Sequence, residues 1–252
     1  MEPLSAVAVT ESVKTGAKSA RGVVSDSLTR IKELDRKFNA FTVVRSEAAL
    51  AEAAALDMGG PGGTGPMVGV PVAVKEEYDV SGFVTTLGGR ANSTPADRDS
   101  HVVARLRGAG AIIVGKTNMP EFGLFPMTES RHHGITRNPW NTGRSPGGSS
   151  GGAAVAVATG MAAVGMASDG GGSIRIPASA VGVVGLKPTR GRVSSAPLPE
   201  QWHGLTGFGP ITRTAADAAL VMDVISGNSP GDEWQLEPPA RPFSESVATD
   251  PE

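Results

Sequence analysis

The chain has 252 residues, of which 39% are hydrophobic and 19% charged, and its formal net charge is -2. This composition is typical of a globular protein with a substantial core, and it argues against disorder. The small net charge and an aromatic content of 4% argue against a nucleic-acid partner. The lack of cysteine excludes disulfides and thiolate chemistry. No apolar run reaches membrane-spanning length and the first residues lack an export-signal pattern, so we expect a cytoplasmic protein with no membrane partner.

The hydrophobic pattern predicts alternating helices and strands along the chain. Apolar residues recur every three or four positions over 20–37, and 46–58 is an alanine-rich second helix. Further helices are predicted at 100–109, 151–160 and 214–226, the last capped by Thr214. Buried strands are predicted at 68–74, 111–114, 161–167 and 181–186, with an ordered loop at 130–149. This alternation predicts an α/β fold with a mixed, largely parallel central sheet flanked by helices.

The last part of the chain differs in composition from the rest. Residues 229–252 contain five prolines and several acids, and they lack the periodic pattern of a core element. We therefore expect one folded portion over residues 1–228, followed by a proline-rich tail or linker over 229–252.

Lys75 is the first candidate functional residue, because it directly follows the apolar run of the predicted strand at 68–74. If its amine stays out of water, desolvation disfavours the ammonium form and lowers its pKa, which makes it a usable base. Taken alone, a lysine at the end of a strand more often has its ammonium in solvent.

A second candidate is the glycine- and serine-rich segment PGGSSGG at 146–152, which contains Ser149. Its glycines allow sharp bends that expose a hydroxyl group. Gly147, Ser149 and Gly151 also match the nucleophile elbow of α/β hydrolases, but that motif needs a preceding strand, and 138–146 is a poor strand. The alternative is a flexible loop without a function.

A third candidate is the segment SDGGGSIRIP at 168–177, where three glycines precede Ser173 at the end of a predicted strand. The backbone N–H groups of Gly170, Gly171 and Gly172 can converge to bind an anion or an oxyanion. A phosphate cradle of a nucleotide-binding protein competes, although no Gly-Lys-Ser/Thr follows. For Asp169 and Arg175 the preferred role is a local ion pair that shapes the turn. The four histidines, His101, His132, His133 and His203, show no metal-ligand spacing, so no metal site is expected.

Together these segments resemble the amidase signature family. The matching stretches are GVPVAVK at 69–75, GKTNMPEF at 115–122, RNPW at 137–140, PGGSSGG at 146–152, SDGGGSIRIP at 168–177 and GLKPTRG at 185–191. The order and the gaps agree, and the combination is far more specific than any one piece. The resemblance runs from about residue 20 to residue 228, and it is strongest to general bacterial amidases of the actinobacterial type.

The resemblance implies a serine amidohydrolase with Lys75 as base, Ser149 as proton relay and Ser173 as nucleophile. In the family the residue matching Ser149 follows a cis peptide bond. The amides of residues 170–173 would hold the oxyanion, and a small-molecule amide would be hydrolysed through an acyl-enzyme without a cofactor or metal. The family's second half, which completes the sheet and much of the acyl pocket, has no counterpart in this chain. We therefore expect an exposed sheet edge, and as partners either a homodimer or a complementing C-terminal segment.

Three alternatives stay open at this point. The first is a catalytically weak or inactive amidase fragment that retains the motifs without a pocket. The second is the glutaminase-type component, called the A subunit, of a glutamyl- or aspartyl-tRNA amidotransferase, which releases ammonia from glutamine. The third is a nucleotide-binding α/β protein, which predicts thermal stabilisation by nucleotides.

Overall fold

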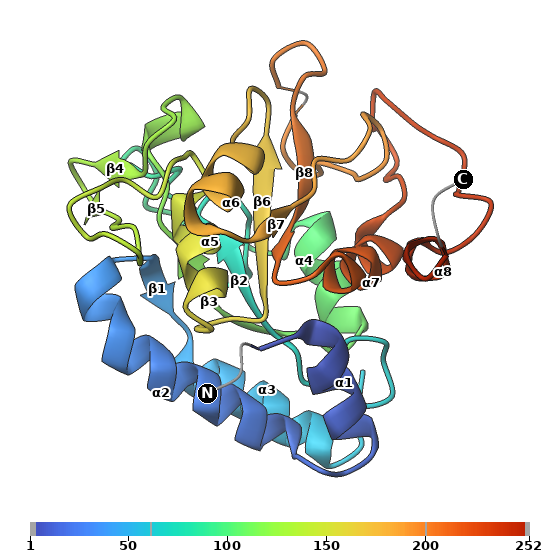
Figure 1. The fold of residues 1–252 in the computed structure, drawn as a ribbon. Coiled ribbons are helices and arrows are strands. Elements are labelled where there is room, and N and C mark those ends of the chain that lie inside the picture. Colours follow the sequence, from blue (N-terminus) through green and yellow to red (C-terminus); the bar gives the residue numbers. More distant parts are fainter. Residues whose placement is uncertain (1–3, 61, 200, 250–252) are drawn as a thin grey trace.

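A six-stranded sheet lies at the centre of the computed structural model, which describes residues 4–60, 62–199 and 201–249 (Figure 1). In spatial order the strands are β1 (Phe41–Val44), β3 (Ile112–Thr117), β2 (Pro71–Lys75), β6 (Val164–Asp169), β8 (Gly207–Thr212) and β7 (Val184–Gly185). A separate short hairpin joins β4 (Glu129–Ser130) to β5 (Gly134–Ile135).

The sheet is mixed, and its parallel pairs lie in the middle. β2 pairs in parallel with both β3 and β6, whereas β1, β8 and β7 pair antiparallel with their neighbours. The predicted α/β fold with a mixed central sheet is therefore confirmed, and parallel pairing is confined to the three central strands. Because β2, β3 and β6 run in one direction, their last residues, Lys75, Thr117 and Asp169, lie at the same edge of the sheet. Crevices at the carboxyl ends of parallel strands are common ligand sites in α/β proteins.

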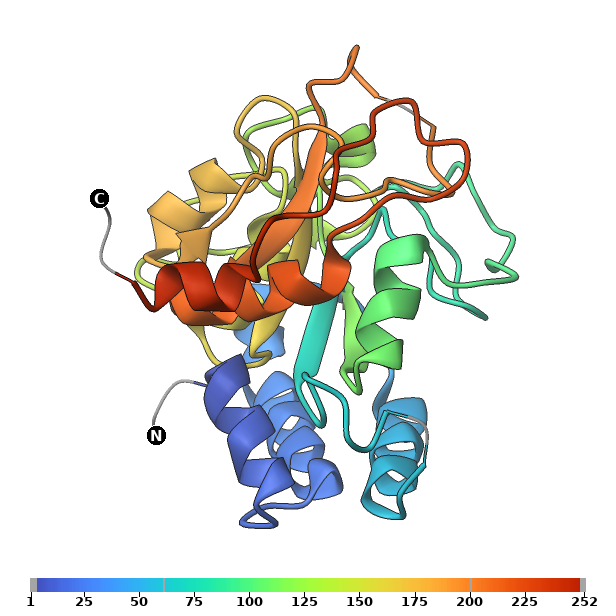
Figure 2. The ribbon, with the colours of Figure 1, turned by 90° about the vertical axis from the view of Figure 1, so that its right-hand side faces the viewer.

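Helices cover both faces of the sheet (Figures 1 and 2). One face packs against α1 (Ala6–Lys14), α4 (His101–Gly108) and α7 (Ala215–Ile225). The other face packs against α2 (Ala20–Phe38), α3 (Ser46–Asp57), α5 (Gly151–Ala158) and α6 (Arg175–Val181). None of the helices in the described part of the chain is long and apolar enough to cross a membrane.

The central strand β2 shows why its sequence is an unbroken apolar run. Val72 and Val74 belong to the core on the side of α4 and α7, whereas Ala73 belongs to the core on the side of α5. Every residue of β2 is buried. A strand covered on both faces needs apolar side chains at successive positions rather than an alternating pattern.

Most predicted helices are confirmed with small shifts at their ends. The Thr214 hydroxyl accepts a hydrogen bond from the Asp217 amide at 3.1 Å, which is the predicted cap. The strand predicted at 68–74 begins only at Pro71, because Gly69 has a φ of +74° and belongs to a turn.

The strand predicted at 181–186 is largely wrong. Val181 ends α6, Gly182 caps that helix with a φ of +76°, and only Val184–Gly185 pairs as β7. Periodicity alone does not separate a short buried strand from a helix end. The elements that the sequence did not predict include α1, β1, α6 and β8.

The described part of the proline-rich segment packs against the rest of the chain. The helix α8 (Phe243–Val247) lies beside α7, and the Asp223 carboxylate accepts the Phe243 amide at 2.6 Å and the Ser244 amide at 3.1 Å. Phe243 packs against the core. The division into a portion over 1–228 and a tail over 229–252 stays a prediction.

Candidate active site

Lys75 is the last residue of β2 and lies in the interior, with 1% of its surface exposed. Its Nζ donates to the Ser149 Oγ at 2.7 Å and to the Ser168 Oγ at 2.9 Å. The Glu77 carboxylate lies 3.5 Å from the same nitrogen and is itself buried. The buried amine therefore has two hydroxyl groups and one carboxylate as its polar neighbours.

Burial has a direct effect on the chemistry of this amine. Desolvation by burial lowers the pKa of Lys75 from its ordinary value of 10.5, while the negative charges of Glu77 and Asp169 offset only part of that shift. A lysine whose pKa is lowered spends more time as the neutral amine, which can accept a proton. The sequence prediction of a desolvated Lys75, rather than a solvent-exposed one, is confirmed.

Ser149 is held by the loop that precedes α5. The peptide bond between Gly148 and Ser149 is cis, as the resemblance implied. Gly148 fits because a Cβ at this position would lie 2.7 Å from the backbone of Met127. The segment before Ser149 is irregular rather than a strand, which agrees with the rejection of the nucleophile elbow. The Ser149 side chain is buried, and its hydroxyl contacts Lys75.

Ser173 lies in the loop between β6 and α6 and is half-buried. Its carbonyl oxygen accepts the Ser150 amide at 3.2 Å, so the two serine loops are joined beside each other. Within the described part of the chain the Ser173 hydroxyl makes no hydrogen bond. The structure thus brings Lys75 and Ser149 into contact, and the transfer of a proton between Ser149 and Ser173 stays a prediction.

Asp169, the last residue of β6, fixes the shape of the Ser173 loop. Its carboxylate accepts hydrogen bonds from the amides of Gly172 at 2.7 Å, Ile174 at 3.1 Å and Arg175 at 3.2 Å. The Arg175 guanidinium adds two more, from Nε at 2.9 Å and from its terminal nitrogen at 2.8 Å. Burial alone would raise the pKa of Asp169, but the hydrogen bonds from Arg175 and from the three amides outweigh it and lower the pKa to about 2. The predicted local ion pair is confirmed.

The three glycines before Ser173 divide into two groups. The Gly172 amide is already engaged by Asp169, and Gly172 has a φ of +123°. In the described part of the chain the amides of Gly170, Gly171 and Ser173 donate no hydrogen bond. The assignment of an oxyanion site to Gly170, Gly171 and Gly172 stays a prediction, and of these three amides only that of Gly172 is already engaged.

Two residues of the site had not been predicted from the sequence. Ser168 is the second hydroxyl partner of Lys75, and Glu77 is its carboxylate partner. A signal for Ser168 was present, because it immediately precedes the last residue of a strand beside β2. Because Val74 pairs with Met166, Lys75 lies close to the last residues of β6. Glu77 carries no local signal that separates it from an ordinary surface glutamate.

A second buried lysine, Lys116, supports the same edge of the sheet. Its Nζ donates to Thr85 Oγ1 at 2.9 Å and to the Val84 carbonyl at 3.0 Å, and it lies 3.4 Å from a Glu76 carboxylate oxygen. Burial lowers the pKa of Lys116. These contacts attach the loop after β2 to β3. Among residues 4–60, 62–199 and 201–249, no group of three or more histidine, aspartate or glutamate side chains is arranged to hold a metal ion.

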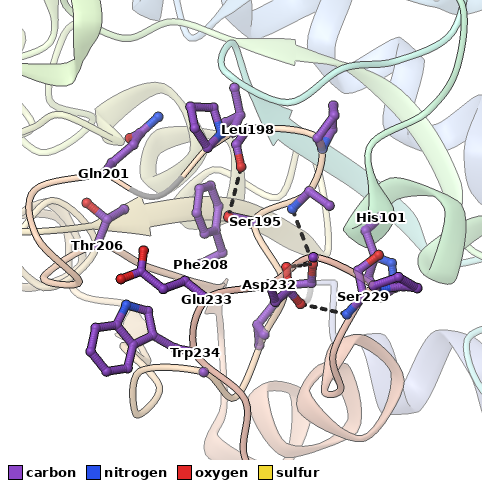
Figure 3. Close-up of a pocket in the computed structure, with 18 of the residues that line it drawn as sticks. His101, Ser195, Leu198, Gln201, Thr206, Phe208, Ser229, Asp232, Glu233 and Trp234 are labelled. Atoms are coloured by element: carbon purple, nitrogen blue, oxygen red, sulfur yellow. Dashed lines mark hydrogen bonds between the residues drawn. The ribbon is translucent and has the colours of Figure 1, made fainter.

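A cavity of about 800 Å³ lies among α4, the segment between β7 and β8, and the segment after α7 (Figure 3). Asp232 joins two of its walls, since its carboxylate accepts the Ser194 hydroxyl at 2.8 Å and the Ser229 amide at 2.6 Å. Lys75, Ser149 and Ser173 do not line this cavity. Its boundary with the Ser173 loop is Thr206, whose Oγ1 lies 3.2 Å from the position of a Cβ on Gly170.

Comparisons with known proteins place this chain in one family. The profile of the Amidase family matches residues 22–252, which extends past the motifs found in the sequence. The Mycobacterium tuberculosis protein AmiA2 is 48% identical over 238 residues, covering 94% of this chain and 49% of the relative. The Nitratidesulfovibrio vulgaris relative, a component of its glutamyl-tRNA(Gln) amidotransferase, is 43% identical over 250 residues, covering 99% of this chain and 51% of the relative.

A solved structure agrees with these sequence matches. The structure of a 6-aminohexanoate cyclic dimer hydrolase complexed with substrate matches with a TM-score of 0.91 at 36% identity, covering 98% of this chain and 52% of that one. The chain therefore belongs to the amidase signature family. It spans about half the length of the curated relatives it matches.

The hydrogen bonds to Asp169 lead to a prediction about acid stability. Because the pKa of Asp169 falls from 3.8 to about 2 on folding, its ionised form stabilises the folded chain above pH 3.8, and this contribution is lost as the pH falls toward 2. We expect Asp169→Asn to lower the free energy of unfolding by about 1–3 kcal/mol at pH 6. The melting temperatures of the two proteins should converge near pH 2.

The control is Asp26→Asn, which removes an exposed carboxylate 3.9 Å from Lys18 and should leave the melting temperature unchanged at each pH. A deficit for Asp169→Asn that is as large at pH 2 as at pH 6 would show that the charge of Asp169 does not stabilise the loop.

Proposed function

We propose that this chain carries the catalytic groups of a serine amidohydrolase that hydrolyses carboxamides to a carboxylic acid and ammonia or an amine. The observation that carries the proposal is the 2.7 Å contact between the Lys75 Nζ and the Ser149 Oγ, both of which are buried. A desolvated amine in contact with a hydroxyl is a base paired with a proton relay. The membership of the chain in the amidase signature family supports the same chemistry.

The proposed first step is a proton transfer along three side chains. The neutral Lys75 amine takes the proton of Ser149, and Ser149 takes the proton of Ser173. The Ser173 oxygen then forms a bond to the amide carbonyl carbon, and the carbonyl oxygen becomes an oxyanion. This is a Ser-Lys variant of the activated serine nucleophile.

The second step breaks the carbon–nitrogen bond. Ser149 gives its proton to the departing amine and regains one from the Lys75 ammonium. The acyl group stays bonded to the Ser173 oxygen. Amides of the 170–173 loop would hold the oxyanion, with Gly170, Gly171 and Ser173 as the unengaged donors. A water molecule then attacks the acyl group and releases the acid, so the cycle needs no metal or cofactor.

The Asp169 network contributes to this scheme by fixing the loop before the reaction starts. The carboxylate holds the amides on both sides of Ser173, at Gly172 and Ile174. An oxyanion site is effective when its donors are already oriented, because no reorganisation is then needed during the reaction. Ser168, which also contacts the Lys75 Nζ, would keep the amine in place when Ser149 turns toward Ser173.

Hydrolysis of glutamine within a tRNA-dependent amidotransferase is a second candidate, favoured by the 43% identity to a component of such an enzyme. The two candidates share the same catalytic groups and differ only in substrate. Rates of ammonia release from glutamine and from simple aliphatic and aromatic amides would distinguish them. A companion C-terminal segment and a homodimer both stay predictions for the partner.

Covalent labelling tests the assignment of the nucleophile. We expect a fluorophosphonate probe to label the wild-type chain and to leave Ser173→Ala unlabelled, with amide hydrolysis reduced by more than about 10³-fold. Ser179→Ala is the matched control, because Ser179 is an exposed serine in the adjacent helix, and its labelling should equal that of the wild type. The readout is the mass of the labelled peptide together with the fraction of protein labelled.

Two results would count against this assignment. Labelling of folded Ser173→Ala at the wild-type rate would mean that another residue is the nucleophile. The absence of labelling in a well-folded wild-type chain would favour the alternative of an inactive fragment.

The pH dependence of labelling tests the role of Lys75. The base acts when it is neutral, so the labelling rate should rise as the pH passes upward through the pKa of Lys75. Glu77 favours the ammonium form, and Glu77→Gln should therefore lower that pKa further and move the midpoint of the profile to lower pH. Glu33→Gln, which changes an exposed residue of α2, should leave the midpoint in place.

Lys75→Met provides the limiting case for the same measurement. It should lose labelling over the whole pH range while retaining the fold. A profile for Glu77→Gln that coincides with wild type, or moves to higher pH, would contradict the role of Lys75 as the base.

A further inference from the structure

Three successive residues beside the Ser173 loop adopt left-handed backbone conformations. Trp202 has a φ of 58°, His203 of 53° and Gly204 of 76°. Glycine adopts this conformation freely, but a residue with a Cβ does so at a cost of about 1–2 kcal/mol. Conformations of this kind persist where the surroundings enforce them, and they concentrate at functional sites.

The Trp202 indole lies against the backbone of the predicted oxyanion loop. A Cβ on Gly170 would lie 3.1 Å from the Trp202 Cε3, and a Cβ on Gly171 would lie 3.8 Å from its Cζ3. The ring thus occupies the space that side chains at these positions would take. Trp202 is nevertheless 49% exposed, so a large apolar surface remains open next to the nucleophile loop.

Ile176 borders the same loop on its other side. A Cβ on Gly172 would lie 2.8 Å from the Ile176 Cδ1, and a Cβ on Gly147 would lie 3.0 Å from its Cγ2. Ile176 is also partly open to solvent. The loop that carries Ser173 therefore lies between an indole and a branched aliphatic side chain.

The side chains within 4 Å of the Cβ positions of this loop are uncharged, whereas the Lys187 ammonium lies beside Gly207, the residue paired with Asp169. The side chains nearest to Gly170, Gly171 and Gly172 are those of Trp202, Thr206 and Ile176, all of them uncharged. The charges of Asp169 and Arg175 are paired with each other. A flat apolar group would find a matching surface on the exposed side chains of Trp202 and Ile176.

We propose that Trp202 determines specificity, and that it selects amides with an aromatic or similarly bulky apolar substituent by packing against that substituent. This inference rests on the proposed hydrolase function and names the class of substrate for that same site. Aromatic side chains provide large contact areas, and aromatic pairs add a further attraction through offset or edge-to-face packing. Sites for small molecules combine such apolar walls with a few well-placed polar groups, here the loop amides.

Two fluorophosphonate probes with the same reactive group test the proposal. One carries a phenylethyl group on phosphorus and the other a methyl group, and the second-order rate constant of labelling is measured for each. We expect wild type to prefer the phenylethyl probe and Trp202→Ala to reduce that preference about tenfold, because the aromatic contact is lost. Trp202→Phe should retain most of the preference, since it keeps an aromatic ring.

Leu205→Ala is the matched control, because Leu205 is an exposed apolar residue three positions along the same loop. Its preference between the probes should equal that of wild type. Equal losses with both probes in Trp202→Ala would overturn the proposal, since Trp202 would then support the loop without touching the substituent. An unchanged preference in that variant would also overturn it. Wild-type protein that reacts with neither probe would refute the hydrolase function itself, and the specificity with it.

Discussion

The burial of one amine at the end of β2 is the constraint on which the rest of the site depends. An ammonium group without water or partners is costly in a protein interior, so Lys75 needs polar neighbours or must lose its proton. Those neighbours are Ser149 from the loop before α5, Ser168 from β6 and Glu77 from the loop after β2. The same burial that lowers the pKa of Lys75 also fixes the position of Ser149.

The sheet explains why distant segments meet at this amine. β2 lies between the parallel strands β3 and β6, so the loops after β2 and β6 emerge at one edge. The Asp169 carboxylate then sets the shape of the loop after β6 through three amides and Arg175. The fold thus places Lys75 and Ser149 in the core, and it leaves Ser173 half-buried in the loop that Trp202 contacts.

Much of this arrangement could be predicted from the sequence, because its signals are local. Three segments each predict their local backbone conformation. They are the apolar run before Lys75, the glycines around Ser149 and the glycines before Ser173. The family resemblance supplied the link between them. The contacts of Glu77 and Trp202 could not be predicted. Glu77 resembles an ordinary surface glutamate in the sequence, and Trp202 lies in a left-handed turn although it is not a glycine. The short strand β7 was misplaced because Gly182 ends a helix that periodicity does not reveal.

A crystal structure of the chain after reaction with a fluorophosphonate would test the central claim most directly. We predict phosphorus bonded to the Ser173 Oγ, and the Ser149 Oγ within about 3.5 Å of both that oxygen and the Lys75 Nζ, the upper limit for a hydrogen bond. The phosphoryl oxygen should face the unengaged amides of the 170–173 loop. An adduct on another residue, or a Ser149 hydroxyl too far from Ser173 to exchange a proton, would contradict the account.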